Sequence, residues 1–305
     1  MPNSSQMQAF NLSHQSAFDT WSKWKLSLYS SQGIERLRKV IEIGPDAPFA
    51  KAQLTKLHQN IDDFNFAFYR IINSSNFDLK ALSLLGRQFG LFELDANLCA
   101  EEDRMTILTD HTSQDDSNKH RQRYIPFSNR ALNWHTDGYY NPQHQRVRAF
   151  ILHCVQPASS GGGNCFIDPD IVYILLRQEN PAFIDALAHP EVMLIPENRD
   201  DKDILRPETA TAVFQVSSDY AILDMRYSQR KKHIIWRDDS LTQQALACLN
   251  ELLGKKSHWH IDYRLKAGEG IVSNNVLHQR EAYNDDTGNR RVYYRARYYG
   301  RVTIT

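Results

Sequence analysis

Apolar residues follow a helical spacing through most of the first third of the chain and a strand-like spacing through much of the rest. The helical spacing predicts helices over residues 16–29, 49–73 and 78–90. Later apolar runs are short and bounded by turn residues, as strands are. We expect these strands at residues 40–44, 105–109, 146–155, 164–168, 213–216, 220–225, 232–236, 259–263, 270–274 and 292–299, with further helices at 169–188 and 240–254.

Short strands after a helical first third predict a mainly β fold with outer helices, an α+β arrangement on a double-stranded β-helix (jelly-roll) barrel. Residues 1–14 are polar and predict a mobile tail. No linker composition follows, so we expect residues 15–305 to form one jelly-roll domain. Residues 110–134 begin with a charged stretch of few apolar residues, which fits a lid beside a site and a plain solvated loop equally well.

Charge and composition limit the classes of molecule that the protein is expected to bind. The 305 residues include 36 basic and 36 acidic side chains, so the formal net charge is zero and no global field favours nucleic acid or membranes. No apolar run approaches about 20 residues, and the N-terminus lacks the pattern of a signal peptide. The four cysteines have no C-x-x-C spacing, as expected of reduced thiols in the cytoplasm. The pattern leaves self-association open, and we expect a small-molecule partner.

One short stretch carries the clearest chemical signal. His135 and Asp137 are two residues apart, so on a strand or at its end both side chains point to the same side. One imidazole and one carboxylate are two of the three ligands of the facial triad that holds Fe(II) in non-haem oxygenases. His278 is the candidate for the third ligand. The pair alone is a weak signal, since a hydrogen-bonded surface pair gives the same pattern.

Four motifs in the same order resemble the taurine dioxygenase (TauD/TfdA-like) family of Fe(II)/2-oxoglutarate-dependent oxygenases. They are Trp134-His135-Thr136-Asp137-Gly138, Gly161-Gly162-Gly163-Asn164-Cys165-Phe166-Ile167-Asp168, Asn275-Val276-Leu277-His278 and Asn289-Arg290-Arg291-Val292-Tyr293-Tyr294-Arg295. The resemblance covers roughly residues 105–300. It implies Fe(II) on His135, Asp137 and His278, 2-oxoglutarate as co-substrate, and hydroxylation by O2 of an unactivated C–H bond in a small anionic or polar substrate.

The resemblance also assigns roles outside the metal ligands. Arg291 matches the residue that holds the C5 carboxylate of 2-oxoglutarate, with its neighbour Arg290 as the competitor, since a guanidinium can hold a carboxylate through two hydrogen bonds. Asn164 stands where many relatives have a Thr that contacts the co-substrate. Arg295 matches a substrate-anion anchor, with a structural ion pair as the alternative. Tyr139 is expected to line the substrate pocket, with ordinary packing equally compatible.

Two other classes of protein remain open. One is a jelly-roll protein that binds a metal or a small molecule without oxidising it, and the other is a zinc hydrolase with the same ligand set. Neither needs a buried arginine after the distal histidine, so Arg291 discriminates between them and an oxygenase. The sequence does not identify the substrate, nor whether bond cleavage or desaturation follows hydroxylation.

Overall fold

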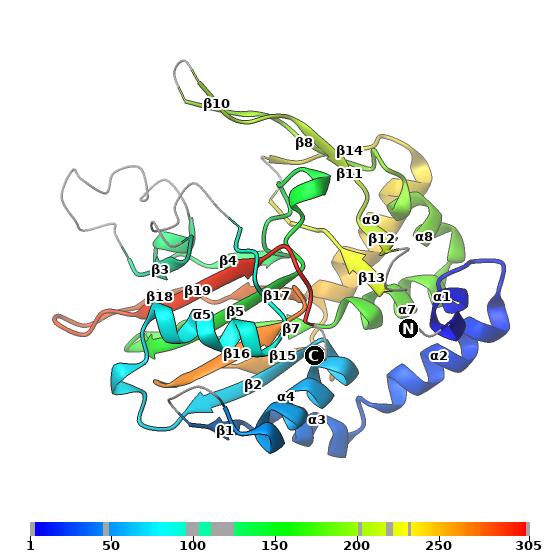
Figure 1. Ribbon diagram of the computed structural model, residues 1–305. Helices are drawn as coiled ribbons and strands as arrows, with labels where there is room; N and C mark the ends of the chain where they lie inside the picture. Colours follow the sequence, from blue (N-terminus) through cyan, green and yellow to red (C-terminus); the bar gives the residue numbers. More distant parts are fainter. Residues whose placement is uncertain are drawn as a thin grey trace. The chain divides into compact units, whose positions relative to one another are not determined.

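The computed structural model describes residues 4–44, 49–95, 104–110, 125–200, 203–217, 222–230 and 233–302 (Figure 1). The chain divides into two compact units, each assembled from three separate segments. The first unit comprises residues 1–31, 134–146 and 167–261, and the second comprises residues 32–133, 147–166 and 262–305. The sequence predicts instead one domain over residues 15–305. Because the segments of the two units alternate along the chain, no single linker in the sequence marks the division.

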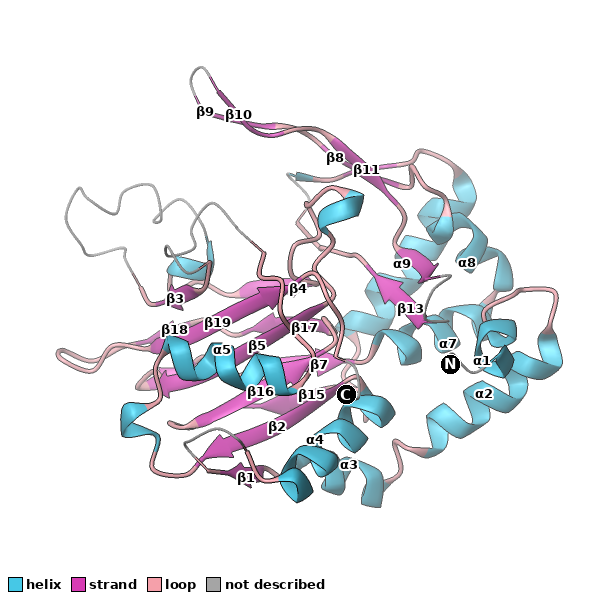
Figure 2. Cartoon of the chain, viewed as in Figure 1, coloured by secondary structure: helices cyan, strands magenta, loops and turns pink. Residues whose placement is uncertain are grey.

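A six-stranded sheet forms the centre of the second unit (Figure 2). Its order is β1 (Ile41–Ile43), β2 (Phe66–Ile71), β16 (Glu269–Ser273), β5 (Ala149–Gln156), β19 (Val292–Tyr298) and β3 (Thr106–Leu108). All neighbours are antiparallel except β1 and β2. The register places Arg295 of β19 opposite Leu152 of β5, which in turn lies opposite Ile271 of β16.

Helices α4 (Lys51–Phe64) and α5 (Leu79–Gln88) pack on one face of this sheet. Their buried side chains share a core cluster with strand residues of the same face, including Leu57, Ile61, Leu82, Leu85, Ile151, Val272 and Ala296. Asn65 ends α4 in the left-handed conformation, with φ 65°, and β2 begins directly after it. The helix expected over residues 49–73 is therefore wrong beyond residue 64. Strand β2 is buried on both faces, so its sequence lacks the alternation that would have indicated a strand.

The opposite face of the six-stranded sheet contacts a four-stranded sheet through aromatic rings. That sheet has the order β15 (Ile261–Tyr263), β7 (Asn164–Ile167), β17 (Leu277–Arg280) and β4 (Leu132–His135). Phe68 stacks on Tyr263 with ring centroids 4.2 Å apart, and Phe150 lies 4.9 Å from the ring of His278. Strand β6 (Ser160–Gly161) follows β5 in the chain and pairs with β18 (Tyr283–Asn284), which follows β17. The candidate ligands His135 and His278 thus lie on neighbouring strands.

The N-terminal segment of the first unit is folded. Helix α1 (Ser4–Ala9) precedes α2 (Gln15–Ser27), and Ala9 and Phe10 are buried. The Arg177 guanidinium donates to the carbonyl oxygen of Ala9 at 2.7 Å, and the rings of Phe10 and Trp21 meet edge to face at 4.9 Å. The sequence predicts a mobile tail over residues 1–14, whereas the structure has helix α1 from residue 4 onward. This segment has few apolar residues, and the buried Arg177 adds hydrogen bonds to its carbonyl oxygens.

The remaining helices of the first unit are α7 (Pro169–Glu179), α8 (Pro181–Ala188) and α9 (Ser240–Gly254). The single helix expected at 169–188 is divided at Asn180, whose side chain caps α8 before Pro181. The strands of this unit are β8 (Met193–Ile195), β9 (Asn198–Asp200), β10 (Asp203–Arg206), β11 (Thr209–Thr211), β12 (Phe214–Ser217), β13 (Ile222–Met225) and β14 (Ile235–Trp236). The first four were not expected, because each is only three or four residues long and only β8 is wholly apolar.

The result is a mixed fold of helices and predominantly antiparallel sheets, which agrees with the expected α+β class. Across the ranges that the structure describes, no helix is both long and apolar enough to cross a membrane. Cys154, Cys165 and Cys248 are free thiols. Most of the stretch expected to be a loop or lid, residues 111–124, lies outside the described residues, and residues 125–127 form a single 3-10 turn.

Candidate metal centre

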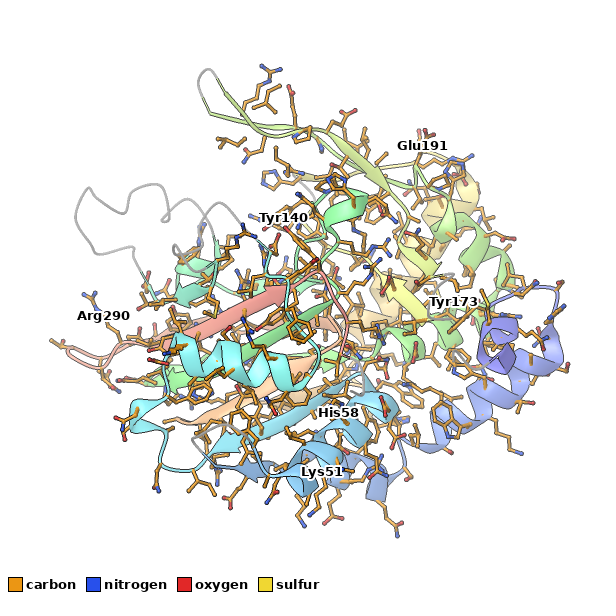
Figure 3. All side chains as sticks on the ribbon, in the orientation of Figure 1. Lys51, His58, Tyr140, Tyr173, Glu191 and Arg290 are labelled. Carbon is orange, nitrogen blue, oxygen red and sulfur yellow. The ribbon has the colours of Figure 1, made fainter. Side chains whose placement is uncertain are left out.

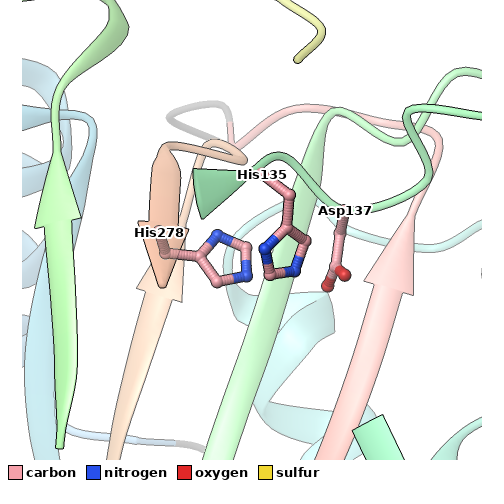
Figure 4. Close-up of side chains that lie close together, drawn as sticks. All are labelled: His135, Asp137 and His278. Carbon is pink, nitrogen blue, oxygen red and sulfur yellow. The ribbon is translucent and has the colours of Figure 1, made fainter. Parts of the chain in front are cut away.

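His135, Asp137 and His278 converge on one point (Figure 4). One ligand atom from each lies within 4.8 Å of the others, which is a spacing that a single metal ion could bridge. Asp137 is buried and the two imidazoles are half-buried. The set of two nitrogen donors and one carboxylate oxygen matches the facial triad of non-haem Fe(II) sites.

The end of β4 fixes His135 and Asp137. His135 forms an isolated antiparallel bridge with Ser228, and the backbone N–H of Thr136 donates to the carbonyl of Tyr227 at 3.0 Å. The Thr136 hydroxyl accepts the N–H of Tyr227 in return. Gly138 then adopts φ 63°, which turns the chain away directly after Asp137. The ligand pair is therefore held on a short backbone pairing rather than on a loop.

His278 is oriented by its own backbone surroundings. Its Nδ1 lies 2.9 Å from the carbonyl oxygen of Val276, so Nδ1–H is the donor and Nε2 carries the free lone pair. This arrangement is the usual support of a metal-binding histidine, because it fixes both the tautomer and the ring plane. Phe150 packs against the same ring at 4.9 Å.

Arg291 is buried between two tyrosine rings. Its side chain is 2% exposed, and its guanidinium carbon lies 3.8 Å from the ring centre of Tyr293 and 5.0 Å from that of Tyr283. Within the described residues, its Nε and Nη1 have no hydrogen-bond partner and no carboxylate pairs with it. A buried guanidinium without a counter-charge is costly, so this position fits an anionic ligand. Arg290, the competing candidate, is exposed.

Sequence reasoning missed Arg280, which lies two residues after His278 on β17. Its guanidinium donates to the carbonyl oxygens of Ser128, at 2.8 Å, and of Arg130, just before β4. It also lies 4.9 Å from the ring centre of Tyr283, on which Arg291 packs as well. Burial, and then the nearby Arg291 charge, lower the pKa of Arg280 to about 10. The i, i+2 rule that paired His135 with Asp137 would also have found this residue.

The other three candidates are Asn164, Arg295 and Tyr139, and their contacts do not by themselves assign them a role. Asn164 at the start of β7 is buried, and its amide nitrogen has no hydrogen-bond partner within the described residues. Arg295 is half-buried on β19, opposite Leu152 and Thr106. Tyr139 is buried, with its ring 5.2 Å from that of Tyr140 in an edge-to-face contact. Tyr139 thus packs within the segment that follows the ligand pair.

Comparison with known proteins gives one family over most of the chain. The description "Taurine catabolism dioxygenase TauD, TfdA family" matches residues 35–297. A uridine-5'-phosphate dioxygenase from a Streptomyces species is 28% identical over 163 residues, which are 51% of this chain and 57% of that enzyme. The chain thus matches little more than half the length of this curated relative.

Solved structures share the fold at low identity. An asparagine oxygenase in complex with Fe(II), 3-hydroxyasparagine and succinate is 16% identical with a TM-score of 0.52, over 90% of this chain and 91% of that one. A taurine dioxygenase from Burkholderia xenovorans is 14% identical with a TM-score of 0.52, over 86% of this chain and 83% of that one. At such identities the likeness extends to the fold alone.

Proposed function

The chain belongs to the taurine catabolism dioxygenase TauD, TfdA family, and we propose that it hydroxylates a small polar or anionic molecule with Fe(II), 2-oxoglutarate and O2. The family match confirms the resemblance that the motifs predicted, including its class of 2-oxoglutarate-dependent dioxygenases. The observation that carries the proposal is the pairing of a two-histidine, one-carboxylate cluster with a buried arginine whose Nε and Nη1 have no hydrogen-bond partner among the described residues.

His135, Asp137 and His278 would hold the metal. Two neutral imidazoles and one carboxylate leave part of the charge of Fe(II) for further anionic ligands. His278 would bind through Nε2, because its Nδ1–H donates to the Val276 carbonyl. When bound, Fe(II) with 2-oxoglutarate and O2 supplies the oxidising power for C–H hydroxylation, and the oxo acid leaves as succinate and CO2.

Arg291 would hold the distal carboxylate of 2-oxoglutarate. Its Nε and Nη1 donors could hydrogen-bond an anionic ligand, and the rings of Tyr283 and Tyr293 keep the guanidinium plane in place. The amide N–H groups of Asn164 would donate to the same co-substrate, as a Thr hydroxyl does in the relatives that the motif resembles. The Arg291 contact would select against a 2-oxo acid that lacks the distal carboxylate.

Tyr139 and Arg295 would contact the substrate. Tyr139 follows the ligand Asp137 by two residues, and Arg295 lies on the face of its sheet that packs toward the four-stranded sheet. The named relatives act on asparagine and on uridine 5'-phosphate, which are small and polar or charged. A substrate of that kind is consistent with an arginine on this face.

We extend the proposal to the architecture. The six-stranded sheet and the four-stranded sheet would be the two faces of a double-stranded β-helix, with α4 and α5 outside it. Neither a zinc hydrolase nor a simple binding protein needs a buried arginine after the distal histidine, whereas an oxygenase that uses 2-oxoglutarate does, and this favours the oxygenase.

Succinate formation tests this function directly. The protein is incubated aerobically with Fe(II), 2-oxoglutarate and single compounds from a panel of amino acids, sulfonates and nucleoside monophosphates. We expect one class to raise succinate formation, with an equal amount of a product that has gained one oxygen atom. Equal succinate formation by Asp137→Ala, or by zinc-loaded protein, would refute the proposed chemistry.

A further inference from the structure

A second group of buried cations surrounds the turn that follows Asp137. Asn141 closes this turn by donating its backbone N–H to Gly138 at 2.9 Å, and its own carbonyl oxygen accepts from the Arg226 guanidinium. Arg206 places its guanidinium 5.5 Å from the ring centre of Tyr140 on the same turn. Arg226 is 3% exposed, whereas Arg206 is half-buried and retains access to solvent.

The backbone brings Arg226 next to the metal ligands. His135 pairs with Ser228, and Thr136 pairs with Tyr227 through two hydrogen bonds. Arg226 directly precedes Tyr227 and Ser228, the two residues that pair with Thr136 and His135. A group bound at Arg226 would therefore lie within the reach of a small substrate whose reacting carbon faces the metal.

Arg226 is a buried cation whose hydrogen-bond partners within the described residues are neutral. Arg146 is paired with Asp224 at 2.8 Å. Arg226 donates to the neutral Thr211 hydroxyl at 2.9 Å and to the Asn141 carbonyl, and its buried Nε has no hydrogen-bond partner in the described part of the chain. Burial, and then the Arg146 charge, lower the pKa of Arg226 to about 9. Among the described residues Arg226 thus forms no ion pair of its own, although the Arg146 and Asp224 charges both lie near it.

We propose that Arg226 and Arg206 bind an anionic group of the substrate, a phosphate or a carboxylate, at the turn formed by residues 138–141. The proposal rests on the function proposed above, whose substrate class it defines more narrowly. A bound anion would supply a counter-charge to Arg226, while the half-buried Arg206 would contact it from the solvent side. The anion would position the substrate, and Arg226 would act in binding rather than in the redox step.

Titration of simple anions tests the proposal. Protein saturated with Fe(II) and 2-oxoglutarate is titrated anaerobically with inorganic phosphate and, separately, with acetate, and the heat of binding is measured. We expect one of the two anions to bind. Its identity shows whether the anionic group of the substrate is a phosphate or a carboxylate. Arg226→Gln should weaken the binding by roughly tenfold or more, and Arg226→Lys should retain most of it. Arg199→Gln, an exposed arginine of the same unit already paired with Glu197, is the matched control and should change nothing.

The visible band of the Fe(II)–2-oxoglutarate complex separates the two proposals. If the unaltered protein lacks the band, the proposed function fails whatever the anions do. If the band is present but neither anion binds, or if both bind equally well to Arg226→Gln, the anion site is refuted. Should Arg226→Gln lose the band through misfolding, Arg206→Gln, at the half-buried position, must weaken anion binding severalfold or the proposal falls.

Discussion

Arg290 and Arg291 are consecutive residues with opposite surroundings: Arg290 is exposed, whereas Arg291 is 2% exposed with its guanidinium 3.8 Å from the ring centre of Tyr293. Figure 3 shows Arg290 at the outer end of the turn that precedes β19. Neighbours on a strand point to opposite sides, so only one of the two can face the interior. The sequence leaves open which of the two arginines holds 2-oxoglutarate, and burial favours Arg291.

We predict that replacing Arg291 removes co-substrate binding. Arg291→Ala should raise the dissociation constant for 2-oxoglutarate roughly a hundredfold, because a charge-assisted pair in a buried site contributes about 2–5 kcal/mol. Arg290→Ala is the matched control and should change the constant less than about twofold. Equilibrium titration of the Fe(II)-loaded protein measures both. The assignment is reversed if Arg290→Ala has the larger effect.

Removing any one metal ligand should abolish iron binding without unfolding the chain. Asp137→Ala and His278→Ala should retain the circular dichroism spectrum but bind less than about a tenth of the Fe(II), since each leaves two ligands of three. His144→Ala removes an exposed histidine near the motif and should bind iron normally. Metal content after desalting is the measurement, and normal iron in Asp137→Ala would exclude the carboxylate as a ligand.

The side chain of Asn164 should contribute modestly to co-substrate affinity. Asn164→Ala should weaken 2-oxoglutarate binding by about threefold to tenfold, the effect of one lost hydrogen bond. Asn164→Thr should restore most of it, because a hydroxyl can donate to the same acceptor. Iron affinity, measured in parallel, should be equal in all three proteins. If Asn164→Ala binds both ligands as the unaltered protein does, Asn164 has no role in the site.

A buried charge cluster should dominate the stability of the first unit. Lys25 lies 2.8 Å from Asp168 and 2.9 Å from Asp170, and its side chain is 1% exposed. Lys25→Met leaves the two carboxylates without their cation, so it should lower the free energy of unfolding by about 3–5 kcal/mol. Lys23→Met, an exposed neighbour on the same helix, should change it by less than about 0.5 kcal/mol. Urea denaturation compares them, and equal midpoints would contradict the prediction.

His153 should make stability fall in mild acid. It is buried against Phe77 with its Nδ1 3.2 Å from the Tyr69 hydroxyl, and burial lowers its pKa from 6.5 to about 4. Because the folded state resists protonation, the unfolded state binds more protons between these two values. The titration of His153 therefore lowers the free energy of unfolding by on the order of 3 kcal/mol as the pH falls from 6.5 to 4.

The control for this prediction is His153→Gln, which cannot titrate. Its free energy of unfolding should fall less steeply than that of the unaltered protein over the same pH range. Parallel pH profiles for the two proteins would show that another group causes the acid sensitivity.

Local pattern sufficed for the metal cluster and failed elsewhere for physical reasons. His135 and Asp137 could be predicted because the i, i+2 rule acts within one strand end. Strand β2 could not, since burial on both faces removes the alternation of apolar and polar residues. Arg226 could not either, because its partner Asn141 is 85 residues away in sequence. The burial of Arg226 among neutral hydrogen-bond partners exists only in the folded chain.

The most direct test of the central claim is the visible spectrum of the anaerobic complex. Fe(II) and then 2-oxoglutarate are added to metal-free protein, and the weak charge-transfer band of a chelated Fe(II)–2-oxo acid is sought. We predict the band in the unaltered protein and in Arg290→Ala, and its loss in His135→Ala and, at moderate 2-oxoglutarate, in Arg291→Ala. Iron bound by His135, Asp137 and His278 without any such band would contradict the account of a 2-oxoglutarate-dependent dioxygenase.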